Sequence, residues 1–267
     1  MPVFLDTTAS DFEVAFGQLL TAKREDSPEV DDIVAGIIAD VRARGDSALI
    51  ELTETFDRLS LTPETLAFSS EEIAEHCARV PAAERSALET AAERIRAYHV
   101  RQMPDDARWT DPDGATLGWR WSAVAAAGLY VPGGLASYPS SVLMNAIPAK
   151  VAGVGRVCIT VPTPDGVVNP LVLLAARIAG VDEIYRVGGA QAIAALAYGT
   201  QSIAPVDKIT GPGNAFVAAA KRRVFGKVGI DMIAGPSEIL VIADGDNDPD
   251  WIAADLLSQA EHDTAAQ

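Results

Sequence analysis

Apolar residues near the start of the chain recur at helical spacing, about every three to four positions. The residues that share one face of this predicted helix are Val30, Ile33, Val34, Ile37, Ile38 and Val41. Ser27 and Pro28 are typical of a helix start, and Gly45 is typical of a helix end. A second helix is predicted from Asp46. Its inward-facing residues would be Leu49, Leu52 and Phe56.

Two more helices are predicted before residue 110. Ser69 or Ser70 would cap a short helix, and Pro81 would open a long one that runs to about Gln102. This region offers no candidate chemistry. Its histidines, His76 and His99, lie in helical stretches rich in Glu and Arg, so we interpret them as surface or helix-end residues.

The pattern changes to strands after residue 110. Asp113-Gly114 is typical of a hairpin turn, and Leu117, Trp119 and Trp121 alternate with polar neighbours as in a strand. A further strand is predicted over residues 123–131.

Residues 130–243 alternate between short apolar runs and helical stretches. Strands are predicted at 157–161, 184–187, 208–210 and 238–243, and helices at 171–179, 190–198 and 214–225. Strand, glycine-rich turn and helix in repetition are typical of parallel βαβ units, which gives an α/β fold. Ligands in such sheets bind at the carboxyl ends of the strands, where these turns would lie.

Four glycine-rich turns lie in this region, at residues 130–134, 187–191, 210–214 and 234–237. None fits the G-x-G-x-x-G or the G-x-x-x-x-G-K-[ST] pattern. Taken singly, each turn is first a tight connection and only second a ligand loop. Together they place Gln191, Asn214 and Ser237 at element starts, where backbone amides can hold a phosphate or a carboxylate.

A helix is predicted from Asp248 or Asp250 to about residue 262. Gln259 and His262 are three positions apart and so share a helix face. An imidazole with an amide oxygen is an acceptable pair of ligands for a divalent metal. The alternative for such a pair is a structural or solvated role.

Composition excludes several classes of function. The chain has 267 residues, with 21 Lys and Arg against 37 Asp and Glu, and a net charge of −16. This charge argues against nucleic acid or an anionic membrane surface as a partner. The N-terminus lacks the pattern of a signal peptide, and apolar runs are too short to span a membrane, so a cytoplasmic location is expected. Cys77 and Cys158 are interpreted as buried small side chains rather than a disulfide.

Five motifs together resemble the histidinol dehydrogenase family. They are GLYVPGG at 128–134, VGGAQAI at 187–193, KITGPGN at 208–214, IAGPSE at 233–238 and DLLSQAEH at 255–262. Their order and spacing match the family over nearly the whole chain.

The resemblance implies a role for six residues. Tyr130, Gln191 and Asn214 match positions that contact NAD, and Ser237 matches a substrate contact. Gln259 and His262 match two zinc ligands that also line the substrate site.

The resemblance also implies a fold and a domain division. It implies two Rossmann-like domains with incomplete parallel sheets, similar to aldehyde dehydrogenases, and a helical N-terminal segment. Residues 1–25 would form that arm. Residues 26–129 with 237–267 would form a first α/β domain on the zinc and substrate side, and residues 130–236 a second Rossmann-like domain.

The implied activity is the zinc-dependent oxidation of L-histidinol to L-histidine with NAD, through the aldehyde, in histidine biosynthesis. The family's homodimer shares its site between subunits. Family members are longer, and their catalytic Glu–His pair and two further metal ligands would lie beyond Gln267. The 267-residue chain alone is therefore expected to lack dehydrogenase activity and to bind zinc weakly or not at all.

Two alternatives remain open at this point. One is a related dehydrogenase that oxidises another polar alcohol, for which the turns would look much the same. The other is a non-catalytic module that binds NAD or a partner only.

Overall fold

The structure, a computed structural model, describes residues 4–22, 28–133, 138–233 and 239–260. The chain forms two compact units, residues 1–232 and 233–267. No helix within the described ranges is long and apolar enough to cross a membrane.

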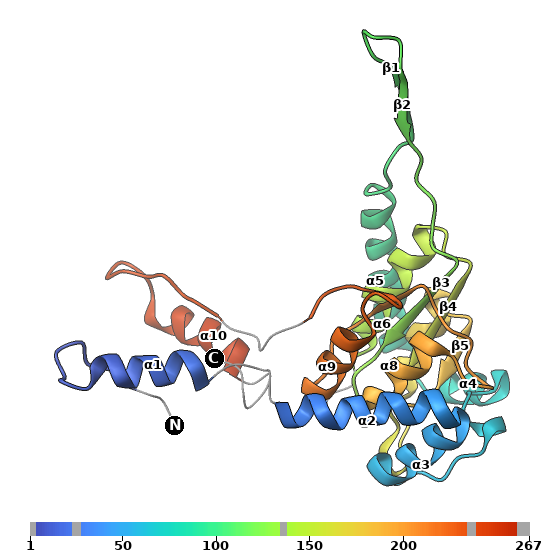
Figure 1. Cartoon of the computed structure of the whole chain (residues 1–267), viewed down its shortest axis with the longest axis horizontal. Coiled ribbons are helices and arrows are strands. Elements are labelled where there is room, and N and C mark those ends of the chain that lie inside the picture. Colours follow the sequence, from blue (N-terminus) through green and yellow to red (C-terminus); the bar gives the residue numbers. More distant parts are fainter. Residues whose placement is uncertain (1–3, 23–27, 134–137, 234–238, 261–267) are drawn as a thin grey trace. The chain divides into compact units, whose positions relative to one another are not determined.

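A parallel β-sheet lies at the centre of the first unit (Figure 1). Its strands, among the described residues, are β3 (Ala126–Tyr130), β4 (Arg156–Thr160), β5 (Glu183–Tyr185), β6 (Lys208–Thr210) and β7 (Gly229–Ile230). Their order is β5-β4-β3-β6-β7. The chain first builds outward on one side of β3 and then returns to its other side, so the order reverses at β3. This reversal opens a crevice at the carboxyl ends of the strands.

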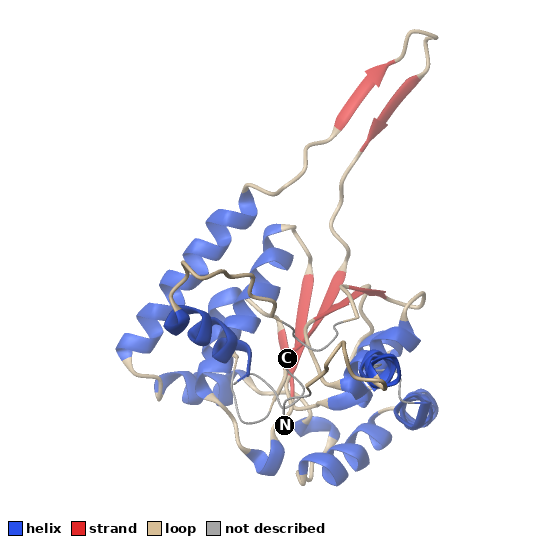
Figure 2. Ribbon diagram, turned by 90° about the vertical axis from the view of Figure 1, so that its left-hand side faces the viewer, coloured by secondary structure: helices blue, strands red, loops and turns tan. Residues whose placement is uncertain are grey.

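Helices cover both faces of this sheet (Figure 2). On one face lie α2 (Pro28–Arg44), α3 (Asp46–Asp57), α8 (Gly189–Tyr198) and α9 (Ala215–Val224). On the other lie α4 (Ser70–Ala78), α5 (Ala82–Val100), α6 (Pro139–Val151) and α7 (Pro170–Ala179). Successive side chains of β3 point to opposite faces of the sheet. Leu129 packs with α6 and α7 on one face, and Tyr130 packs with the helices around α8 on the other. The mixed α/β fold with a parallel sheet is therefore confirmed.

Helix ends are defined by the residues that the sequence indicates. The Ser69 hydroxyl accepts the N–H of Glu72, and the Glu72 carboxylate accepts the N–H of Ser69, a reciprocal cap for α4. Asn214 Oδ1 accepts the N–H of Val217 at the start of α9. Gly180 ends α7 with a φ of 77°, a conformation that glycine adopts without strain.

Two predicted core residues are in fact exposed. Val34, Ile38 and Val41 of α2 are buried as predicted, but Ile33 is exposed. Leu49 of α3 is buried, whereas the ring of Phe56 is 53% exposed. Phe56 lies in the last turn of α3, beyond the reach of the core, and faces a pocket described below.

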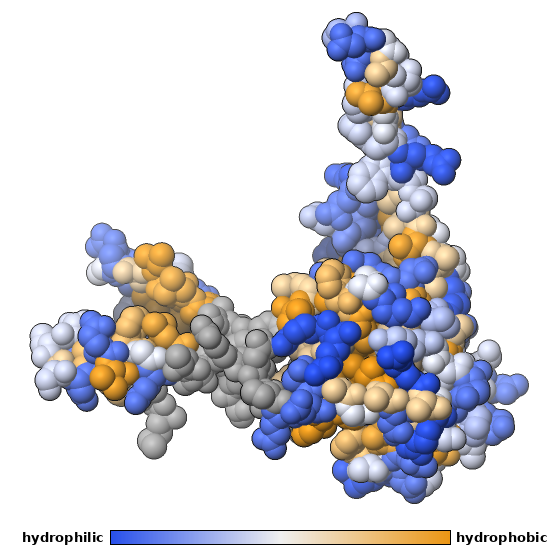
Figure 3. All heavy atoms as spheres, viewed as in Figure 1, coloured by the Kyte–Doolittle hydropathy of each residue, from blue (hydrophilic) through white to orange (hydrophobic). Residues whose placement is uncertain are grey.

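The predicted hairpin forms a separate two-stranded ribbon. Strand β1 (Ala107–Thr110) pairs antiparallel with β2 (Thr116–Trp119), and the Asp111 side chain accepts two backbone N–H groups of the turn. The rings of Trp109 and Trp119 pack edge to face with centroids 5.1 Å apart. All of β2 is exposed, and the ribbon projects from the helices and sheet of the first unit (Figure 3).

Three elements differ from the prediction. Helix α6 is not predicted from the sequence. It contains Pro148 in its interior, and proline usually ends a helix. Strand β7 has two residues, too few to give a pattern. The predicted strand at 238–243 is wrong, because residues 239–243 have no regular structure and no partner strand within the described part of the second unit. Leu240 and Ile242 are exposed there instead.

The remaining elements are short or lie near the ends of the chain. They are helix α1 (Phe12–Ala22), the 3₁₀ turns η1 (Pro63–Thr65) and η2 (Pro164–Gly166), and helix α10 (Pro249–Ala260). The start of α10 agrees with the prediction, since Asp248 Oδ1 accepts the N–H of Asp250. The predicted division into domains stays a prediction.

Candidate functional site

A pocket of about 350 Å³ lies at the carboxyl ends of the strands of the sheet. This volume is at the lower end of the range for small-molecule sites. Its lining comes from six segments: Ile37; Phe56 and Asp57; Tyr130 and Gly133; Pro162 and Pro164; Gly188, Gly189, Ala190 and Gln191; Asn214 and Phe216. The pocket thus gathers the three residues that the motifs relate to NAD, namely Tyr130, Gln191 and Asn214.

The glycine pair at 188–189 brings bare backbone to this pocket. A side chain at Gly188 would place its Cβ 2.5 Å from Pro162, which leaves no room for any other residue. Gly189 has a φ of 64° and begins helix α8. Because the first N–H groups of a helix have no partner within it, this turn can present donors to an anion.

Tyr130, the last residue of β3, fixes that turn. Its hydroxyl oxygen accepts the N–H of Gly189 at 3.1 Å, which leaves the hydroxyl hydrogen available to a ligand. The side chain is buried, and burial raises the pKa of Tyr130 above its ordinary value of 10.0. The nearby charge of Asp57 acts in the same direction, so the phenol stays neutral at physiological pH.

Gln191 and Asn214 reach the pocket from two helix starts. Gln191 is in the first turn of α8 and is only 2% exposed. Asn214 precedes α9, and its Oδ1 is used by Val217, so its amide nitrogen is the group left to bind a ligand. Both side chains can offer an N–H donor to a ligand in the pocket.

An ion pair between a buried lysine and a partly exposed aspartate anchors the turn that carries Asn214. Lys221 of α9 is 3% exposed, and its amine donates to the carbonyl of Gly211 at 3.0 Å and pairs with Asp231. Asp231 Oδ2 in turn accepts the N–H of Gly211 at 2.8 Å. Gly211 has a φ of 120°, and its Cβ would lie 2.1 Å from the carbonyl oxygen of Tyr130. Lys221 and Asp231 therefore hold the Gly211 turn in place through its carbonyl and its N–H, and the turn lies directly against the end of β3.

Asp57 is the charged residue in the lining of the pocket. It is 9% exposed, and its Oδ2 has no hydrogen-bond partner within the described part of the chain. Burial raises the pKa of Asp57 above 3.8, an effect that Arg58 opposes and Asp165 reinforces. A buried carboxylate without a partner destabilises the folded state. Such a residue is therefore a functional candidate.

The predicted metal and substrate residues are not described at the side-chain level. Ser237 and His262 lie outside the described residues, and Gln259 lies in α10 but its side chain is not described. Within residues 4–22, 28–133, 138–233 and 239–260, no three His, Cys, Asp or Glu side chains are grouped as metal ligands would be. Their assignments stay predictions.

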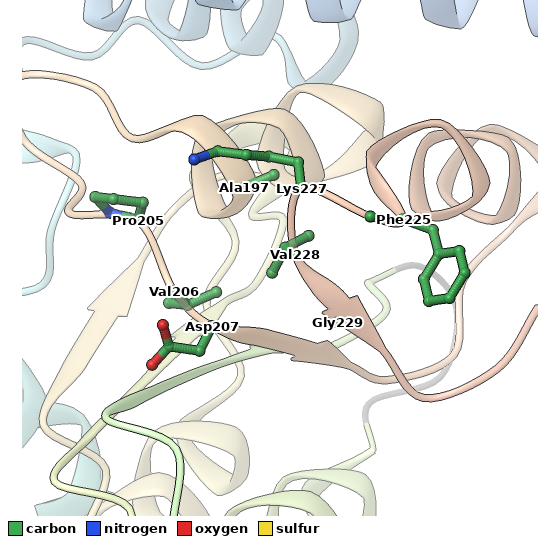
Figure 4. A pocket seen from close by; sticks show the side chains of 9 residues that line it. Ala197, Pro205, Val206, Asp207, Phe225, Lys227, Val228 and Gly229 are labelled. Atoms are coloured by element: carbon green, nitrogen blue, oxygen red, sulfur yellow. The ribbon is translucent and has the colours of Figure 1, made fainter.

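Another hollow, of about 360 Å³, opens at the opposite ends of strands β6 and β7 (Figure 4). The carboxylate of Asp207 is committed there, because it accepts the N–H of Ala126 at 2.8 Å. Phe225 and Lys227 point in different directions, so they do not converge on one ligand position. Parallel sheets bind ligands at their carboxyl ends, which favours the pocket that contains Tyr130.

A comparison with protein families matches the histidinol dehydrogenase model over residues 20–267. This chain belongs to the histidinol dehydrogenase family. It is 81% identical over its full length to a histidinol dehydrogenase of Ruegeria pomeroyi and 75% identical to one of Cereibacter sphaeroides. It spans 62% of the length of each of these relatives.

A solved structure of the family has the same fold. The crystal structure of histidinol dehydrogenase from Elizabethkingia anophelis superposes with a TM-score of 0.87 at 36% sequence identity. The alignment covers 100% of this chain and 61% of that one. The resemblance inferred from the five motifs is thus confirmed at the level of the family.

The family motifs do not point to the whole of this pocket. Phe56 and Asp57 come from the region that offers no chemistry in the sequence, and Phe216 follows the KITGPGN motif. No local pattern distinguishes Phe56-Asp57 from any amphipathic helix end. The nearest signal is the αL conformation of Arg58, which follows them with a φ of 54°, and this is visible only in the structure.

Proposed function

We propose that the protein carrying this chain oxidises L-histidinol to L-histidine through the aldehyde, with NAD as the hydride acceptor, in the last steps of histidine biosynthesis. Family membership supports an oxidoreductase of this pathway. In this proposal the chain supplies the dinucleotide site. NAD, when bound, supplies the hydride acceptor.

One observation carries the proposal. Tyr130, Gln191 and Asn214 lie far apart in the sequence but line one pocket at the reversal point of the sheet. If β3 is counted as the first strand, the order of strands is 3-2-1-4-5, which is the order of dinucleotide-binding Rossmann sheets. We infer that this sheet is an incomplete Rossmann-like sheet.

The pocket fits a dinucleotide in two respects. The start of α8 offers the backbone N–H groups of Ala190 and Gln191 to a phosphate, and Gly188 and Gly189 leave room for its approach. Phe56 and Phe216 provide apolar rings beside these polar groups.

The chain's own residues would bind and orient the dinucleotide. Tyr130 would donate its free hydroxyl hydrogen, and Asn214 its amide hydrogens, while the Gly189 turn approaches the phosphates. Because Lys221 and Asp231 hold the turn before Asn214, the amide would be in position before the ligand arrives. Preorganisation of this kind lowers the entropic cost of binding.

We further propose that Gln259 and His262 contribute zinc ligands, and that the protein is a homodimer. The support for both is the match of the DLLSQAEH motif and family membership. A nitrogen and an oxygen donor are compatible with zinc. The remaining ligands would come from outside the described residues.

Two variants of Asn214 test the cofactor assignment. Asn214→Ser keeps an oxygen that can cap α9 but removes the amide, whereas Asn214→Ala removes both. Isothermal titration of the protein with NAD is expected to show weakened binding for both variants, with normal zinc content. Normal NAD affinity in Asn214→Ser would refute a contact between this amide and NAD.

Turnover separates the substrate from its alternatives. NADH formation is measured at 340 nm with L-histidinol, L-histidinal and a panel of other amino alcohols, using the protein that carries this chain. We expect oxidation of the first two substrates and production of histidine. Preference for a different alcohol would contradict the proposed substrate but leave the dinucleotide site in place.

A further inference from the structure

Asp57 lines the pocket, and one of its carboxylate oxygens, Oδ2, is buried without a hydrogen-bond partner within the described residues. It lines the same cavity as Tyr130 and Gln191, and the residue is 9% exposed. Among the described residues, none donates a hydrogen bond to its Oδ2. Native proteins pair nearly all such groups, so this oxygen calls for a donor from outside the described residues.

The position of Asp57 is also unfavourable for the fold. It is the last residue of α3, at the negative end of the helix dipole, where a carboxylate is destabilising. The neighbouring cation does not compensate at close range. Arg58 turns away with a φ of 54° and forms a bidentate pair with Asp165, with N···O distances of 2.6 and 2.5 Å.

The surroundings of Asp57 suit a nucleotide. Phe56 and Phe216 offer apolar surface to a ring, and the Gly188–Gly189 turn offers backbone donors to phosphates. An ionised carboxylate accepts hydrogen bonds and donates none. The matching group on a nucleotide is the vicinal diol of a ribose, which can donate two hydrogen bonds to one carboxylate.

We propose that Asp57 accepts hydrogen bonds from the ribose hydroxyls of the adenosine half of a bound dinucleotide, and that it rejects a dinucleotide with a 2′-phosphate. This rests on the proposed NAD site. A phosphate at that hydroxyl would bring about two further negative charges against a buried carboxylate. Arg58 is already paired with Asp165, so it does not neutralise them.

The test measures dinucleotide affinity by titration calorimetry, using the protein that carries this chain. Wild type is expected to bind NAD at least about tenfold more tightly than NADP, because hydrogen bonds to a charged group and like-charge repulsion each contribute on that scale. Asp57→Asn keeps the shape but loses the charge. We expect its NAD affinity to fall roughly tenfold and its preference over NADP to shrink by a similar factor.

Asp165→Asn is the matched control. It removes the same charge from the same neighbourhood, but Asp165 is exposed and does not line the pocket. Its affinity for NAD is expected to stay within about twofold of wild type, as is usual for a surface pair. Melting curves by circular dichroism confirm that both variants are folded.

Dinucleotide analogues test the contact on the unmodified protein. NAD lacking the 2′- or 3′-hydroxyl of the adenosine ribose is expected to bind wild type more weakly than NAD, with a smaller difference in Asp57→Asn. The 3-acetylpyridine analogue lacks the N–H donors of the nicotinamide carboxamide. The ratio of its affinities for wild type and Asp57→Asn is expected to equal the ratio measured with NAD.

Three outcomes would overturn the inference. One is an unchanged NAD-to-NADP preference in Asp57→Asn, and another is deoxy analogues that bind wild type as well as NAD. The third is a wild-type affinity that falls only for the acetylpyridine analogue and not for the deoxy analogues. This result would place the carboxamide, rather than the ribose, at Asp57. If wild type binds no dinucleotide at all, the proposed NAD site fails as well.

Discussion

Replacing Lys221 with methionine removes the amine that ties α9 to the Gly211 turn. Methionine has a similar length and is apolar, so packing around the buried stem is retained. What is lost is the bond to the Gly211 carbonyl and the pair with Asp231. The effect therefore reports the polar contribution of the anchor.

The structure sets the expected size of this effect. Removing one partner of a fully buried pair costs about 3–5 kcal/mol. Asp231 is not fully buried, since its side chain is 30% exposed and keeps the N–H groups of Gly211 and Met232. Its charge is thus partly solvated, and we expect a loss of about 2–3 kcal/mol in the free energy of unfolding. For a chain of this size that corresponds to a Tm lowered by roughly 5–10 °C.

Thermal and urea unfolding followed by far-ultraviolet circular dichroism measures this loss. Lys208→Met is the matched control, because Lys208 donates to the Ile230 carbonyl at 3.0 Å but is exposed. Its effect should stay within about 0.5 kcal/mol. In a double-mutant cycle with Asp231→Asn, the double variant should lose less than the sum of the two single losses. A Lys221→Met effect as small as the control, or strict additivity, would refute the anchor.

Three further predictions follow from other sites. Because burial raises the pKa of Asp57 in the folded state, ionisation of this carboxyl destabilises the fold at pH values above its ordinary pKa of 3.8. Asp57→Asn should therefore raise the Tm near pH 7. This gain should shrink as the pH is lowered toward 3.8. Burial raises the pKa of Cys158 to about 12, and Cys77 is buried too, so a thiol reagent should modify both only on unfolding; rapid labelling of native protein would contradict this. Asn214→Ala should cost about 1 kcal/mol in unfolding free energy through the lost cap, and Asn214→Ser much less.

Local chemistry predicts the helix boundaries well. Ser69, Gly180 and Asn214 act through hydrogen bonds or backbone conformations that involve only residues a few positions away. Such signals are complete within the sequence itself. The same holds for the hairpin turn at Gly114, whose φ is 88°.

Long-range packing explains the errors. Helix α6 forms despite Pro148 because its buried residues, such as Leu143 and Ile147, pack against α5 and α7. The apolar run at 239–242 has strand-like composition, but a strand also needs a partner, which the described part of its unit does not provide. Composition alone carries neither piece of information.

The candidate site divides in the same way. Tyr130, Gln191 and Asn214 lie in motifs that the sequence displays, and the structure brings them to one pocket. Asp57 and Phe56 enter that pocket only because α2 and α3 pack on the α8 layer. When the packing of other elements brings a residue to the site, the sequence around that residue carries no signal of its role.

The reversal of strand order at β3 also governs when the sheet can be completed during synthesis. β3 pairs on one side with β4, which follows after a single helix, but its other neighbour, β6, comes only at residues 208–210. Until the ribosome has produced that segment, one edge of the most central strand stays open. Parallel pairing over such separations is slow and prone to aggregation. The strand that ends in Tyr130 therefore keeps an unpaired edge until residues 208–210 have been synthesised.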